Sequence, residues 1–193
     1  HLSLARFLID NMQNEELKKY RKSFLIGSIW PDCIPSFLTK RHTIDETFGL
    51  LKKEIKKITE NYDANKGITG SYCRRLGIIT HYIADYFTYP HNACFAGSMK
   101  EHILYEIELM DFLKKFLNNS PIDRIRKHNN NFHTIEKISE FIKEMHEEYL
   151  NGLKQIAIDC KYIVELCVHV VKAILQILEI NILTETQHQV KIA

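Results

Sequence analysis

The chain has 193 residues, of which 45% are hydrophobic and 26% charged, and its formal net charge is +2 with histidine neutral. This composition is typical of a globular protein and predicts one domain, residues 1–193. The small charge gives no support to a stable nucleic-acid partner, and no stretch reaches the ~18 uncharged apolar residues of a membrane span.

The first sixty residues predict three helices. Apolar residues recur at three- and four-residue spacing near residues 2–12 and 17–27. The segment 30–40, which contains two prolines, is expected to be a loop. Thr43 and Glu46 have the spacing of a capping box, which predicts a helix from there to about residue 58.

The middle of the chain predicts two more helices. Ser71 opens a helical pattern that continues to about residue 89, where Pro90 should stop it. Ser98 and Glu101 form a second capping box, which opens another helix. A polar loop is expected over residues 118–133.

From residue 134 to 183 the pattern is helical for about 50 residues, which as one straight helix would measure roughly 75 Å. A globule of this size is only about 40 Å across. A break is therefore expected between Asn151 and Tyr162, where Gly152 lies. The whole pattern predicts an all-α fold, a single compact bundle of about seven to nine helices.

Two histidine–acid pairs have the spacing of a metal site. His81 and Asp85 are four residues apart on a predicted helix, so both project from one face, and Gly77 one turn earlier would leave room beside them. His102 and Glu106 repeat the arrangement. Imidazole and carboxylate suit Zn²⁺, but a helical pair of this kind is equally an ordinary structural contact, so each pair alone leaves both interpretations open.

The order of all the candidates favours the metal interpretation. The chain contains an early histidine, a Pro-Asp step, a histidine, an HxxxD helix, a histidine six residues beyond that Asp, and an HxxxE helix. This order resembles the zinc-dependent phospholipase C family, whose helical fold is shared with the single-strand nucleases of the same superfamily. The resemblance covers roughly residues 1–106, and its elements are His1, Asp32, His42, His81, Asp85, His91, His102 and Glu106.

The resemblance implies a site for two to three zinc ions. Asp32, His42, His81 and Asp85 would hold one ion. A second would be held by His91, His102 and Glu106, and a third by His1 with a bridging Asp85. Clustered cations would polarise the phosphoryl oxygens and lower the pKa of a bound water. Asp32 is the candidate to position or deprotonate that water.

The sequence departs from the family pattern in two ways. Exported members begin with Trp, whose terminal amine and carbonyl complete the third zinc site, whereas residue 1 here is His1. The third site would then depend on His1, Asp85 and solvent, or on a residue upstream. In addition, no C-terminal lipid-binding domain follows, so membrane attachment through one is not expected.

The resemblance implies a hydrolase that converts a phospholipid to diacylglycerol and a phosphorylated headgroup. Such an activity is compatible with peripheral contact with a membrane. One alternative is a zinc-dependent single-strand nuclease, but such nucleases usually end in HxxxD after a longer gap, and here His102 follows His91 by only eleven residues. The second alternative is a helical domain that binds metal but does not catalyse a reaction. Five cysteines without a CxxC pair favour a reducing, cytoplasmic compartment, while a secreted protein trimmed at its N-terminus remains an alternative.

Overall fold

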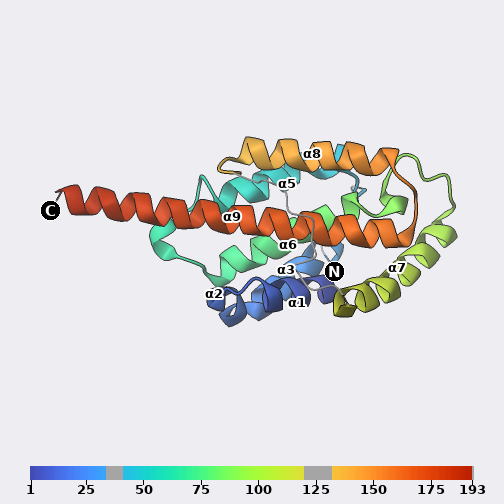
Figure 1. Ribbon diagram of the computed structural model, residues 1–193, viewed down its shortest axis with the longest axis horizontal. Helices are drawn as coiled ribbons and strands as arrows, with labels where there is room; N and C mark the ends of the chain where they lie inside the picture. The colour runs from blue at the N-terminus through green and yellow to red at the C-terminus, as the bar shows by residue number, and fades with distance from the viewer. Residues whose placement is uncertain (34–40, 120–131, 193) are drawn as a thin grey trace.

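The computed structural model describes residues 1–33, 41–119 and 132–192, with the side chains of 188–192 left out. All regular secondary structure in these ranges is helical, which confirms the all-α bundle (Figure 1). The helices are α1 (Leu2–Asn11), α2 (Glu15–Lys19), α3 (Arg21–Cys33), α5 (Ile44–Ile58), α6 (Gly70–Tyr86), α7 (Met99–Asn119), α8 (Ile135–Asn151) and α9 (Ile156–Ile192), with short 3-10 turns η1 (Ala64–Lys66) and η2 (Tyr89–His91).

Helix α6 is the central element of the bundle and is buried along most of its length. It packs against α3, α5 and α9, and its contact with α3 is the most extensive. Two glycines permit this contact. A Cβ on Gly77 would lie 2.3 Å from the Phe24 carbonyl oxygen, and one on Gly27 would lie 2.0 Å from the Arg74 carbonyl oxygen. The space expected beside Gly77 is therefore filled by the backbone of α3.

The prediction of one helix over 17–27 followed by a loop from residue 30 is wrong in two respects. The segment is divided at Tyr20 into α2 and α3, and α3 continues through Pro31 to Cys33. Pro31 removes one backbone N–H and crowds the carbonyl one turn earlier, but it lies in the last turn and is buried in the bundle, so packing overrides the local signal. Residues 34–40 of the expected loop lie outside the described residues.

Both capping boxes mark true helix starts. Thr43 Oγ1 accepts from the Glu46 backbone N–H at 3.3 Å, which caps α5. Ser98 caps α7 reciprocally: its Oγ accepts from the Glu101 N–H at 3.3 Å, and its own N–H donates to the Glu101 carboxylate at 2.6 Å. Helix α6 ends at Tyr86, slightly before the predicted stop at Pro90, which lies in η2.

The predicted break in the last segment is confirmed, because α8 ends at Asn151, Gly152 is its C-cap, and α9 begins at Ile156. Helix α9 nevertheless has 37 residues and is roughly 55 Å long, which exceeds the width expected for the globule. Figure 1 shows its C-terminal part projecting beyond the other helices. Among the described helices, none has the length and apolarity needed to cross a bilayer. The polar loop expected from residue 118 begins later, because α7 continues to Asn119, and 120–131 lie outside the described residues.

Candidate metal centre

The candidate ligands come from six different segments that converge at one end of α6. His1 precedes α1, Asp32 lies in the last turn of α3, His42 precedes α5, and His91 lies in η2. The two pairs that share a helix are His81 with Asp85 on α6, and His102 with Glu106 on α7.

A first group of donor atoms surrounds a point beside α6. His42 Nδ1 lies 2.9 Å from Asp85 Oδ2, His81 Nε2 lies 3.1 Å from the same oxygen, and the two ring nitrogens are 3.1 Å apart. Asp32 Oδ1 is 3.7 Å from the His42 nitrogen and 3.5 Å from that of His81. Four donors at about 2.0–2.1 Å from a tetrahedral Zn²⁺ would be about 3.4 Å apart. These separations therefore fit a four-coordinate cation, and three mutually close donor atoms are poorly explained by hydrogen bonding alone.

The ring of His81 is oriented by the contact between α3 and α6. Its Nδ1 lies 3.0 Å from the backbone carbonyl oxygen of Ser28. A carbonyl can only accept, so Nδ1 carries a proton and Nε2 faces the carboxylates, where it donates to them when the ring is protonated and would offer its lone pair to a metal ion when the ring is neutral. A ligating histidine is commonly fixed in this way by an outer hydrogen bond.

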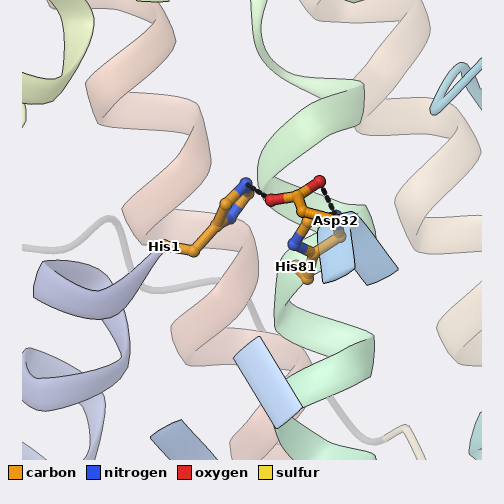
Figure 2. Close-up of side chains that lie close together, drawn as sticks. All are labelled: His1, Asp32 and His81. Carbon is orange, nitrogen blue, oxygen red and sulfur yellow. Dashed lines mark ion pairs between the residues drawn. The ribbon is translucent and has the colours of Figure 1, made fainter. Parts of the chain in front are cut away.

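Both carboxylates of this group also approach His1. Asp85 Oδ1, the oxygen not used by His42 and His81, lies 3.2 Å from His1 Nε2. Figure 2 shows the Asp32 carboxylate between the rings of His1 and His81, with Oδ2 4.0 Å from His1 Nε2. Each carboxylate thus has one oxygen near His1 and the other near the ring nitrogens of His42 and His81.

A second group lies where η2 meets α7. Glu106 Oε1 is 2.9 Å from His91 Nε2 and 3.1 Å from His102 Nε2. The η2 turn is held by Asn92, whose side-chain amide donates to the carbonyls of Tyr86 and Thr88. This second group provides three ligand atoms that lie close enough together to hold a cation.

Burial and charge make the site an electrostatic cluster. Burial alone would raise the pKa of Asp85, but the neighbouring histidines, chiefly His81 and His1, hold it well below its usual value. Burial favours the neutral form of His91, yet the carboxylates of Asp85 and Glu106 raise its pKa to about 9. The hydrogen bond to Asp85 raises the pKa of His42. A cluster that binds protons in this way can bind a divalent cation in their place.

Two adjoining clefts give access to the donor atoms. One, of about 320 Å³, is lined by His1, Asp32, Asp85, His91 and Glu106 together with an apolar wall that includes Leu109 and Met110. The other, of about 490 Å³, shares His91 with the first, and its lining also includes Arg41, His42, Asp45, Phe95, Met99 and His102.

One residue important to the site was not found from the sequence. Asp159, on the first turns of α9, is fully buried and accepts from the Tyr89 backbone N–H at 2.9 Å, the Tyr105 hydroxyl at 2.8 Å and the Tyr149 hydroxyl at 2.9 Å. Tyr89 is two residues before His91 and Tyr105 precedes Glu106, so this carboxylate links both segments of the second group to the bundle. The sequence signal for this role is that Asp159 is an acidic residue inside the apolar run that begins at Ile156.

A protein-family model described as zinc dependent phospholipase C matches residues 1–156. No curated protein and no solved structure matches the chain.

Proposed function

The chain belongs to the zinc-dependent phospholipase C family, and we propose that it hydrolyses the phosphodiester of a phospholipid to diacylglycerol and a phosphorylated headgroup. The observation that carries the proposal is the position of Asp85, whose two oxygens face different histidines beside a second cluster on the same cleft. A purely structural pairing of His81 and Asp85 would not require this convergence.

We assign the ligands by the donor groups described above. His42, His81, Asp85 and Asp32 would hold one zinc ion, and the separations of their donor atoms support four-coordination. A second ion would be held by His91, His102 and Glu106, and a third by His1 with Asp85. Bound zinc would polarise the phosphoryl oxygens and acidify an attacking water.

Asp32 is the residue we assign to position or deprotonate the attacking water. Its side chain is 50% exposed, and its oxygens lie 3.5–4.0 Å from the nearest histidine nitrogens. Asp85, in contrast, is nearly buried and lies within 2.9–3.2 Å of three histidines. The looser carboxylate, open to the cleft, can accept a proton from water while the tighter one holds the cluster together.

The lining of the cleft that contains Asp85 suits a substrate that is polar at one end and apolar at the other. Phosphodiester and headgroup would lie at the histidines and carboxylates, and the apolar wall formed by Leu4, Leu109, Met110, Leu113 and Ile163 suits the diacylglycerol part. A single-strand nuclease on the same fold would need no such wall.

The test is an assay of zinc-loaded protein against a short-chain phosphatidylcholine below its micelle concentration and, separately, against single-stranded DNA. We expect diacylglycerol and phosphocholine from the first and no cleavage of the second. Asp32→Asn should lower kcat by roughly 10²-fold or more, and zinc content is measured on the same sample because Asp32 is also assigned as a ligand. Cleavage of DNA alone would establish the nuclease alternative, and zinc binding without turnover of either substrate would establish a non-catalytic metal domain.

A further inference from the structure

Helix α7 carries a row of exposed apolar side chains beside the site. Met99, Ile103, Ile107 and Met110 are 72%, 51%, 51% and 49% exposed. Their spacing of three and four residues places all four on one face of the helix, since each residue turns it by about 100°. We call these four residues the α7 stripe.

The α7 stripe is continuous with the mouths of both clefts. Met99 lines the cleft that contains His42, and Met110 lines the cleft that contains Asp85. On the same helix the proposed ligands Glu106 and His102 lie about 55° and 95° from the centre of the stripe in helical projection. A surface that covers the α7 stripe would therefore lie directly over the entrance to the site.

Lysines lie within and beside the α7 stripe. By helical position Lys114, which pairs with Asp111 at 3.4 Å, falls within its face, and Lys100 lies about 65° from its centre. Glu106 lies at the opposite edge, about 55° from the centre, where the zinc ion it is proposed to hold would offset its charge. The two lysines have long side chains that can lie along an apolar surface while the ammonium reaches a phosphate. An apolar row bordered by lysines is the pattern of a helix that lies in the plane of a membrane interface.

We propose that the α7 stripe docks the protein on the surface of a phospholipid bilayer, with Ile103 and Ile107 inserted among the headgroups. This inference rests on the proposed function, because it gives the clefts a lipid to act on. A helix in the interface lies about 5–10 Å into the headgroup region, the depth at which the phosphodiester lies. A second protein copy on the same face would instead cover the entrances to both clefts.

The central variant is I103S/I107S, since neither side chain lines a cleft. Its matched control is I180S/L183S, which removes apolar side chains that are 42% and 62% exposed on the projecting end of α9. Binding is measured by sedimentation with sucrose-loaded vesicles of phosphatidylcholine and phosphatidylserine. Turnover of monomeric short-chain phosphatidylcholine, zinc content and thermal melting are measured on the same samples.

We expect I103S/I107S to lower vesicle binding by about tenfold or more, with zinc content and monomer turnover unchanged, while I180S/L183S binds like the wild type. The single variant Ile107→Ser is measured beside the double one and should show a smaller loss, which keeps the test valid if the double variant melts early. Equal vesicle binding by the wild type and Ile107→Ser, or no binding by any form, overturns the inference. Stripe-dependent binding without hydrolysis of any phospholipid would support the docking surface and reject the proposed function.

Discussion

The backbone carbonyl of Ser28 lies 3.0 Å from Nδ1 of His81. This single hydrogen bond connects the packing of the bundle to the chemistry of the site, because it keeps a proton on Nδ1 and so leaves Nε2 as the ring nitrogen that a metal ion would use. It exists because α3 and α6 approach closely at Gly27 and Gly77. The orientation of His81 in the candidate metal site thus depends on a helix–helix contact made by two glycines that are not themselves proposed metal ligands.

The first prediction follows from that contact. Gly77→Ala would place a Cβ 2.3 Å from the Phe24 carbonyl oxygen and 2.7 Å from the Ser28 backbone nitrogen, so α3 must shift. We expect a loss of stability of about 1–3 kcal/mol and weaker zinc binding, measured by chemical denaturation and by titration with a zinc chelator.

The control for this prediction is Gly49→Ala, at a helix position where an added Cβ meets nothing within 4 Å. It should stabilise the protein by up to about 1 kcal/mol and leave zinc affinity unchanged. Equal behaviour of the two variants would show that the glycine contact does not position His81.

The second prediction concerns pH. In the folded protein without metal, burial disfavours the charged form of His91, but the carboxylates of Asp85 and Glu106 raise its pKa from 6.5 to about 9. The stabilisation from this charged histidine is complete below pH 6.5 and is lost as the pH rises to 9, because the unfolded chain releases its proton first. The Tm of the zinc-free protein should therefore fall by roughly 5 °C across this interval.

Zinc should have the opposite dependence on pH. Neutral imidazole is the ligand, so the increase in Tm caused by zinc should grow between pH 6.5 and 9. Differential scanning fluorimetry with and without a chelator measures both effects. A zinc-free Tm that rises over this range would contradict the charge arrangement assigned to His91.

The third prediction concerns Asp159. Replacing it with Ala leaves the Tyr89 N–H and the hydroxyls of Tyr105 and Tyr149 without their buried acceptor, which should cost about 3–5 kcal/mol. Asp159→Asn keeps one acceptor oxygen and should cost less, about 1–3 kcal/mol. The exposed Asp111→Ala on α7 should change stability by no more than about 0.5 kcal/mol. Urea denaturation of the three variants gives these values, and a similar small loss in all three would mean that the buried carboxylate has no structural role.

Much of the helical pattern could be predicted from local signals. The capping boxes at Thr43 and Ser98 specify helix starts because each satisfies backbone N–H groups within four residues. The path of α3 through Pro31 could not be predicted, since what keeps the segment helical is burial against parts of the chain far away in sequence. The projecting end of α9 could not be predicted either, because the width of a compact globule sets no limit on a helix whose end extends beyond the bundle.

The candidate site was predictable only where its chemistry has a sequence pattern. The HxxxD and HxxxE pairs are visible because helical spacing places both side chains on one face. The Ser28 carbonyl has no such signature, since every residue carries a backbone carbonyl and only the fold decides which one meets His81. The partners of Asp159 come from three separate elements, so no spacing along the chain could reveal them.

We propose that Asp85 serves two metal ions whereas Glu106 serves one, and metal stoichiometry distinguishes these roles. Asp85→Asn keeps the size and helix position of the side chain but removes the charge that lies 2.9–3.2 Å from His1, His42 and His81. Cations about 3.5–4 Å apart repel strongly, and a shared carboxylate offsets that repulsion.

The decisive measurement is elemental analysis of zinc in the reconstituted wild type, Asp85→Asn and Glu106→Gln. We predict two to three ions in the wild type, loss of both sites that share Asp85 together with phosphodiester hydrolysis in Asp85→Asn, and loss of mainly the second ion in Glu106→Gln. An Asp85→Asn protein with wild-type zinc content and activity, and a stability loss of only about 1–3 kcal/mol, would contradict the bridging role and with it the multi-zinc phosphodiesterase.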